Sequence, residues 1–377
     1  MVKEIYFKPA LQIENTGDLL INKAAIDLLR TYGRVIIDDK NTPDWFIDQI
    51  SVKDTDYRLS EISGKSLFRT IFRKLMNGQI NTQIYLVIQP GHTSRKGRKI
   101  AMAGFREFLK FSILKALGCR IIRTGFSIGP FDNYNAWMES LSSKNYYHYA
   151  VRDNESLELA KKYKFKQPQY APDLAWNYSP RKNEETEDQG YYVLSFRSNP
   201  HGKVHDASYL NPIKQELHDL LKRTIPPQSR IIVAYQVKYD RDASIDLVNE
   251  LAQSFPNIEL LDKKLLLNDA ERLYSGAKCV ISNRLHVLLL AMQVDSLALP
   301  FVYETDNRKI TSIYKDNQLS FMILPCNEKT SVLADKVNYV LKNKAQILEE
   351  FRKLVYKNKK LIRYKMDEVF DVPAINN

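Results

Sequence analysis

The residues best suited to chemistry lie where a predicted strand meets a predicted helix, in the segment Ser282-Asn283-Arg284-Leu285-His286. The strand is Cys279–Ser282, and a helical apolar run, Val287–Met292, follows the segment. An arginine at a helix start presents a planar fork of donors to a carboxylate or phosphate, and a nearby histidine can transfer a proton near neutral pH. The segment therefore predicts an anion site with Arg284 as ligand and His286 as acid. In the alternative interpretation, Ser282 or Asn283 only caps the helix, the arginine lies on the surface and the histidine packs.

A second junction closes the predicted strand Tyr147–Val151 and opens a helix, with the sequence Val151-Arg152-Asp153-Asn154-Glu155-Ser156. Asp153 and Asn154 are natural N-caps, so a structural role explains them. Arg152 has no capping role, and we therefore expect it to bind an anion.

A third junction, Glu14-Asn15-Thr16-Gly17-Asp18, follows the first predicted strand and precedes the first predicted helix. Gly17 allows the backbone to approach a ligand closely. Asp18 is either a general base or an N-cap, and the sequence leaves both interpretations open.

The elements that position these junctions alternate between short strands and helices, which predicts parallel βαβ units. The clearest helix is Leu19–Leu29, with apolar residues close to a 3.6-residue period. The predicted strands are Glu4–Phe7, Val35–Ile37, Ile84–Ile88, Arg120–Arg123, Tyr147–Val151, Tyr191–Phe196, Ile231–Ala234, Ile258–Leu261, Cys279–Ser282 and Leu297–Pro300. In open parallel sheets, ligands bind beyond the carboxyl ends of the strands, so the three junctions lie where a ligand is expected.

A polar stretch, Ser179–Gly190, interrupts the alternation near the middle of the 377 residues and predicts a linker. The length suits two domains. We therefore expect an α/β protein of two Rossmann-like, doubly wound domains, residues 1–182 and 190–377.

The net charge of +12 and the pI of about 9.3 indicate anionic partners. Basic residues concentrate in His92–Lys99 and in Arg352–Lys365, and a solvated surface is the simplest interpretation of each. The second run predicts an amphipathic helix, because its apolar residues can share one face. That helix either packs on the N-terminal domain or binds the inner leaflet of the membrane peripherally.

Several classes of protein are disfavoured by what the sequence lacks. No apolar run reaches the roughly 18 residues that span a bilayer, and the start lacks a signal peptide's apolar core, so we expect a cytoplasmic protein. The histidines form no metal-binding pair, and the P-loop and G-x-G-x-x-G patterns are absent. The basic residues do not interleave with aromatic ones, which disfavours nucleic-acid binding. The scattered cysteines predict reduced packing residues: Cys119, Cys279 and Cys326.

Taken together, these junctions resemble the polysaccharide pyruvyl transferase family. The likeness covers most of the chain and rests on the order and spacing of Gly17-Asp18, Gly125-Phe126-Ser127-Ile128-Gly129-Pro130, Val151-Arg152-Asp153 with Ser156, Pro172-Asp173-Leu174-Ala175, Ser282-Asn283-Arg284-Leu285-His286, Leu290-Ala291-Met292 and Tyr303. The loop Gln89-Pro90-Gly91-His92 carries one glycine where family members often have several.

The resemblance implies a glycosyltransferase-B-like fold with its active site in the interdomain cleft. It also implies phosphoenolpyruvate as donor and, as product, a ketal that joins pyruvate to two hydroxyls of a cell-surface polysaccharide precursor. Arg152, Arg284 and His286 match the family's donor-binding and catalytic positions, and Asp18 matches its N-terminal acidic position.

The expected roles follow from that chemistry. Arg152 and Arg284 clamp the donor, with Asn283 and Leu285 beside it; His286 is the acid and Asp18 the base. The expected backbone or acceptor contacts are Asn15, Gly17, Gly91 and His92, with acceptor loops at Ser198–Lys203 and Val237–Arg241. The acceptor is a lipid-linked or nucleotide-linked sugar, and no metal or cofactor is required. The alternative is a glycosyltransferase of the same fold that uses a nucleotide-sugar donor.

Overall fold

The computed structural model describes residues 2–10, 12–78, 81–181, 190–199 and 206–372. The chain divides into two compact units. Unit 1 comprises Met1–Ile13, Ile21–Tyr178 and Asn358–Asn377, and unit 2 comprises Glu14–Leu20 and Ser179–Lys357. The segment that carries the first junction is therefore grouped with the second half of the chain. Most of the predicted linker, residues 182–189, lies outside the described residues.

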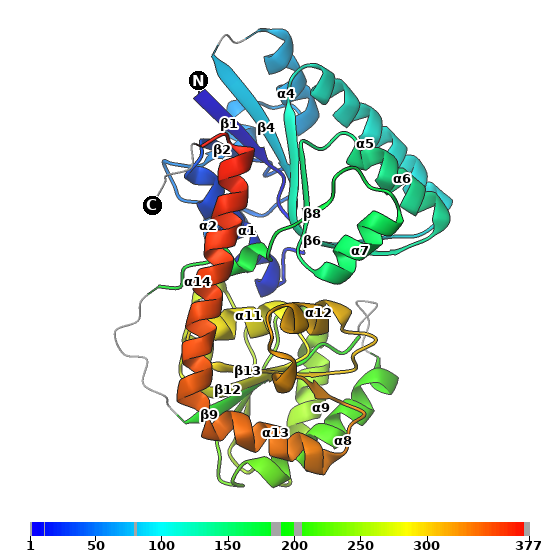
Figure 1. The fold of residues 1–377 in the computed structure, drawn as a ribbon. Helices are drawn as coiled ribbons and strands as arrows, with labels where there is room; N and C mark the ends of the chain where they lie inside the picture. Colours follow the sequence, from blue (N-terminus) through cyan, green and yellow to red (C-terminus); the bar gives the residue numbers. More distant parts are fainter. Residues whose placement is uncertain (1, 11, 79–80, 182–189, 200–205, 373–377) are drawn as a thin grey trace. The chain divides into compact units, whose positions relative to one another are not determined.

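Unit 1 is built on a parallel sheet with the strand order β3-β2-β1-β4-β6-β7-β8, and β5 pairs with β6 (Figure 1). Its strands are β1 Val2–Phe7, β2 Arg34–Ile37, β3 Tyr57–Arg58, β4 Thr82–Ile88, β5 Gly91–Arg95, β6 Arg120–Phe131, β7 His148–Val151 and β8 Gln169–Tyr170. Its helical segments are α1 Thr16–Arg30, which begins in unit 2, α2 Asp44–Ile50, α3 Leu59–Ile62, α4 Leu67–Met76, α5 Arg98–Ala116, α6 Asn133–Ser143, α7 Asn154–Lys162 and η1 Leu174–Asn177.

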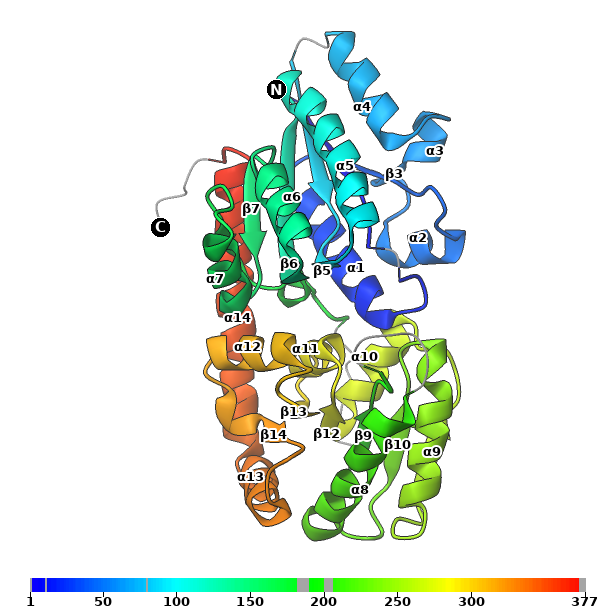
Figure 2. The same cartoon turned by 90° about the vertical axis from the view of Figure 1, so that its right-hand side faces the viewer.

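Unit 2 has a second parallel sheet with the order β11-β10-β9-β12-β13-β14 (Figure 2). Its strands are β9 Tyr191–Ser195, β10 Ile231–Ala234, β11 Ile258–Leu261, β12 Ala277–Ser282, β13 Leu297–Val302 and β14 Leu324–Pro325. Its helical segments are α8 Ala207–Thr224, η2 Lys238–Asp240, α9 Arg241–Leu251, α10 Leu267–Ser275, α11 Leu285–Gln293, α12 Arg308–Asp316, η3 Ser320–Met322, α13 Thr330–Lys342 and most of α14 Lys344–Val369.

In each sheet the first strand lies between the second and the fourth, which is the strand order of a Rossmann fold. The order reverses between β1 and β4 in unit 1 and between β9 and β12 in unit 2. Loops on the two sides of such a reversal diverge, so this is where a doubly wound sheet binds its ligand. The predicted fold class is confirmed.

The predicted strands are all present because each is a short, apolar run buried in a sheet. Val193, Val233 and Val280 are fully buried in unit 2, and Ile5 and Ile121 are fully buried in unit 1. The sequence missed β3, β8 and β14, which have two residues each, and β5, whose residues are polar. Such segments carry too few apolar residues for a pattern to form.

The expected basic helix is part of α14, and its apolar residues are already used inside the protein. Leu354 and Ile362 are buried, and so are Phe351 and Met366. The last turns of α14 belong to unit 1, where the ring of Phe370, the residue after the helix, stacks on Tyr32 at 4.6 Å. The apolar face that a membrane would need is therefore packed against protein.

Across the ranges that the structure describes, no helix combines the length and apolar character that crossing a bilayer demands.

Candidate functional site

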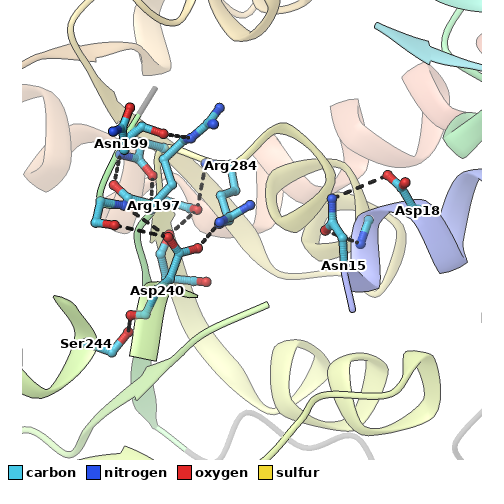
Figure 3. A network of polar contacts seen from close by, with 12 residues as sticks. Asn15, Asp18, Arg197, Asn199, Asp240, Ser244 and Arg284 are labelled. Atoms are coloured by element: carbon cyan, nitrogen blue, oxygen red, sulfur yellow. Dashed lines mark hydrogen bonds and ion pairs between the residues drawn. The ribbon is translucent and has the colours of Figure 1, made fainter. Parts of the chain in front are cut away.

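The candidate site of unit 2 lies beyond the carboxyl ends of three neighbouring strands. Arg197 follows β9, Asp240 ends the short helix after β10, and Arg284 follows β12. Because β10, β9 and β12 are adjacent and parallel, their carboxyl ends meet at one edge of the sheet. The site thus spans the β9/β12 reversal, and the polar contacts that join its residues are drawn in Figure 3.

Two side chains at the end of β12 fasten its loop to the loop after β9. The Asn283 amide oxygen accepts the N–H of Arg197 at 2.7 Å, and its NH₂ group donates to the Arg197 carbonyl at 3.2 Å. The Ser282 hydroxyl donates to the Ser195 carbonyl and accepts the N–H of Arg284 at 3.0 Å. This arrangement fixes the backbone of both arginines.

The interpretation of Ser282 or Asn283 as the helix cap is wrong. The N-cap of α11 is Arg284, and its side chain makes no capping hydrogen bond. The serine and asparagine side chains instead bind the β9 loop. Leu285 is the first residue of α11 and is buried.

Arg284 and Asp240 form a buried ion pair at this edge. Asp240 also accepts the backbone N–H of Ser198 at 3.1 Å and the Ser198 hydroxyl at 3.4 Å. The Nε of Arg284 is buried and has no hydrogen-bond acceptor among the described residues. The guanidinium therefore has donor capacity that Asp240 does not use.

The site gathers two buried positive charges. Burial, together with the charge of Arg197, lowers the pKa of Arg284, while Tyr239 and Asp18 raise it. Burial also lowers the pKa of Arg197, whose Nε donates to the Asn199 carbonyl at 2.8 Å. Each arginine thus disfavours the charge of the other, and an anionic ligand would relieve that repulsion.

The first junction lies against His286 of the same unit. Around Gly17 there is no room for a side chain, because a Cβ there would lie 2.7 Å from Nδ1 of His286 and 3.0 Å from its Cβ. The Thr16 hydroxyl holds the segment by donating to the Leu265 carbonyl at 2.7 Å. The close approach predicted for Gly17 is thus an approach to His286, which is the second residue of α11 and half-buried.

Asp18 is not the cap of α1. It is the third residue of the helix, and Asn15 precedes the first turn. The Asn15 amide oxygen accepts the N–H of Gly17 at 3.0 Å, and its NH₂ group donates to the Asp18 carboxylate at 3.3 Å (Figure 3). Because Asn15 does the capping, the role of general base is the one left for Asp18, and it stays a prediction.

The Arg152 side chain lies in unit 1, within a buried network after β7. Its Nη1 donates to Asp173 at 2.6 Å, and its Nε donates to the Ser127 hydroxyl at 2.8 Å. Ser127 in turn donates to Asp153 at 2.5 Å, and Asp153 caps α7 as predicted. The network joins three segments of the predicted family pattern, and the donor contact expected of Arg152 stays a prediction.

The family model for polysaccharide pyruvyl transferase matches residues 15–295. The chain belongs to this family. The match runs from Asn15 through the end of α11, and so it includes the whole of the site described above. Among curated proteins, none matches the sequence.

Solved structures show the fold. Anabaena HepE in complex with UDP superimposes with a TM-score of 0.61 at 10% identity, covering 99% of this chain and 100% of that one. Methanocaldococcus jannaschii UDP-GlcNAc 2-epimerase gives 0.51 at 11% identity, with coverage of 90% and 93%. Thermobaculum terrenum O-GlcNAc transferase gives 0.53 at 12% identity; 98% of this chain is covered, which spans 66% of that protein. The pyruvyl transferase therefore has the glycosyltransferase-B-like fold.

The pyruvyl transferase has a second polar region in unit 1, at the carboxyl ends of β4 and β6. A cavity of about 200 Å³ is lined there by Gln89, His92, Arg95, Glu107 and Arg123, among others. Gly91 begins β5 with a φ of +116°, a conformation that favours glycine. The structure thus brings His92 to a cavity, in a different unit from Asn15 and Gly17.

Sequence reasoning missed the roles of Arg197 and Asp240. Arg197 directly follows the predicted strand Tyr191–Phe196, so the signal that singled out Arg284 was available for it as well. Asp240 fell in a loop expected to bind the acceptor, Val237–Arg241, and it pairs with Arg284 instead. Of the other expected acceptor loop, residues 200–203 lie outside the described residues.

Among the side chains that the structure describes, no group of three or more His, Cys, Asp or Glu residues is arranged to hold a metal ion.

Proposed function

We propose that the protein transfers pyruvate from phosphoenolpyruvate to two hydroxyls of a sugar in a polysaccharide precursor, and that the donor binds in unit 2. Membership of the family supports the transfer. The observation that carries the donor assignment is the pair of buried guanidinium groups, Arg197 and Arg284, at the β9/β12 reversal. Phosphoenolpyruvate has a carboxylate and a phosphate, so two arginines suit it.

The N-terminus of α11 adds to this anion site. Its free backbone N–H groups and partial positive charge favour a phosphate or carboxylate beside Leu285 and His286. Asn283 would act through the loop that it holds, since its side chain binds the backbone of Arg197 on both sides. The arginine fork would therefore be preorganised before the donor arrives.

The proposed reaction begins when His286 gives a proton to the methylene carbon of the donor. C2 becomes oxocarbenium-like, and a sugar hydroxyl attacks it while Asp18 accepts the hydroxyl proton. The C2–O bond to phosphate then breaks, and the second hydroxyl closes the ketal. Two hydroxyl protons are released: one restores His286, and the other leaves with phosphate. The arginines stabilise the departing phosphate, so the scheme needs no metal or cofactor.

The acceptor is a lipid-linked or nucleotide-linked sugar, and the reaction is cytoplasmic. The cavity beside His92 in unit 1 is the candidate acceptor pocket, because its polar side chains suit sugar hydroxyls. Its donors and acceptors alternate in charge: Arg95 pairs with Glu107 and Glu139, and Arg123 pairs with Glu139. Such a network is rigid enough to select among hydroxyl arrangements.

The second candidate function is glycosyl transfer from a nucleotide sugar. It is favoured by one observation, the fold shared with Anabaena HepE, which has been crystallised in complex with UDP-glucose. Fold alone does not choose between the two donors.

The experiment that tests the proposal is mass spectrometry of lipid-linked and nucleotide-linked sugars incubated with the protein and each donor. A mass gain of one pyruvate ketal with phosphoenolpyruvate, lost in Arg284→Ala, is the expected result. A mass gain of a hexose from a UDP-sugar, with none from phosphoenolpyruvate, would show the protein to be a glycosyltransferase instead.

A further inference from the structure

Helix α5 of unit 1 leaves a row of large apolar side chains in solvent. Met102 is 63% exposed, and Phe105, Leu109 and Ile113 are 45–46% exposed. Their spacing of three and four residues puts them on one face of the helix. The face toward the protein is made by other residues, Gly104, Phe111 and Leu114, which are buried. The apolar row is therefore a second, outward face that packing does not explain.

Aromatic residues of the neighbouring helix continue this face. Helix α6 packs beside α5 (Figure 2), and its Trp137 and Tyr134 are 63% and 55% exposed. The guanidinium of Arg98, at the start of α5, lies over the Tyr134 ring at 5.3 Å. Tryptophan and tyrosine with one wet and one apolar side are the residues that gather at the boundary between lipid headgroups and acyl chains.

The same face is strongly basic. The segment Arg95–Ala116 holds seven Lys or Arg residues and one acid, Glu107, which is within ion-pair distance of Arg95. On the helical wheel, Arg98, Lys99 and Arg106 border the apolar row. Helix α4, which packs on the other side of α5, adds exposed Arg69 and Arg73.

We propose that the α5 face, defined as Met102, Phe105, Leu109 and Ile113 with Trp137, docks on the surface of an anionic lipid bilayer. The apolar row would enter the acyl boundary, and the bordering basic residues would meet lipid phosphates. A second copy of the chain is a poorer occupant, because it would bring another set of positive charges onto the same face. The proposal does not depend on the pyruvyl transfer reaction.

Helix α14 is the natural comparison within the same chain. It is also rich in lysine and arginine, but Leu354 and Ile362 are buried. It therefore offers charge without an apolar face, whereas α5 offers both. Exposed residues on α14, such as Tyr356 at 69%, serve as matched controls.

The test is flotation of the full chain with vesicles of neutral phosphatidylcholine, with and without anionic phosphatidylglycerol, in the absence of substrates. We expect binding to the anionic vesicles that weakens at high salt. Phe105→Ser/Leu109→Ser should reduce partitioning at least about tenfold, because two apolar side chains leave the bilayer. Arg106→Gln/Lys110→Gln should reduce it about fivefold for each charge. Tyr356→Ser and Lys357→Gln/Lys360→Gln, on α14, should bind like the wild type.

Three results would overturn the proposal. One is equal flotation of the wild type and Phe105→Ser/Leu109→Ser, and another is a loss of binding caused only by the α14 variants. The third is a wild-type dimer that fails to bind vesicles and that Phe105→Ser/Leu109→Ser converts to a monomer, which would make a second copy the occupant. All substituted side chains are exposed, and unchanged thermal unfolding confirms that each variant is folded. A pyruvyl transfer assay is read separately, so the two proposals fail independently.

Discussion

Two buried arginine–aspartate pairs, one in each unit, look alike in the sequence and differ in their surroundings. Arg152 with Asp173 and Arg284 with Asp240 both follow parallel strands at helix starts. In unit 1 the Nε of the arginine donates to Ser127, and the pair belongs to a closed network. In unit 2 the Nε of the arginine finds no acceptor among the described residues, and a second arginine lies close enough to lower its pKa.

The difference separates a pair that completes a structure from one that is incomplete without a ligand. A buried charge is tolerated when its partners satisfy it, and its removal then costs stability. A buried arginine with unused donor capacity beside another cation is poised for an anion. By this criterion, unit 2 is where the donor should bind, and Arg152 is the residue whose predicted role most needs a test.

The largest expected effect sharpens the comparison from the side of the chemistry. His286 lies one turn from the unit 2 pair, and so His286→Gln should lower kcat by about 10²- to 10⁴-fold while donor affinity changes only a few fold. Calorimetric binding of phosphoenolpyruvate alongside kcat separates these quantities. If the variant bound donor weakly but turned over normally at saturation, His286 would be a ligand and not the acid.

The next effect concerns the unit 1 pair. Arg152→Ala leaves Asp173 buried without its partner and should lower the free energy of unfolding by about 3–5 kcal/mol, with little change in the KM for donor of the folded enzyme. Denaturant unfolding and steady-state kinetics measure the two. The double variant Arg152→Met/Asp173→Leu should recover much of the stability, because no charge is left unpaired.

An Arg152→Ala enzyme with normal stability and a raised donor KM would break the comparison. Both arginines would then bind donor, as the family resemblance implies.

Arg284→Ala and Arg197→Ala should each weaken donor binding by about 10- to 150-fold, the loss of one charge-assisted contact of roughly 1.5–3 kcal/mol. Lysine should restore little, because a point charge does not reproduce a bidentate fork. Arg230→Ala, which removes an exposed arginine of the same unit, is the matched control and should bind normally. Wild-type affinity in both site variants would move the donor site elsewhere.

The smallest effect tests the packing of Gly17 against His286. A Cβ at this position would lie 2.7 Å from Nδ1 of the histidine, so Gly17→Ala should displace the ring and lower kcat about tenfold, with donor affinity unchanged. Gly64→Ala is the control, since nothing lies within 4 Å of its Cβ position. An unchanged kcat in Gly17→Ala would mean that the ring position is not critical.

The sequence by itself determined the elements and their order. Apolar periodicity marked the long strands and α1, and Asp153 was correctly predicted as an N-cap. These features depend on neighbours within a few residues, which is why a pattern reveals them. The placing of arginines at strand ends was visible for the same reason.

Only the tertiary structure decided what each of those residues contacts. Asp240 meets Arg284 because β10, β9 and β12 are adjacent, and Asp173 meets Arg152 because β8 lies beside β7. Likewise, α14 buries its apolar residues while α5 exposes a row of them, although both sequences read as basic and amphipathic. Strand order and helix orientation bring together residues tens of positions apart, and no local pattern encodes those distances.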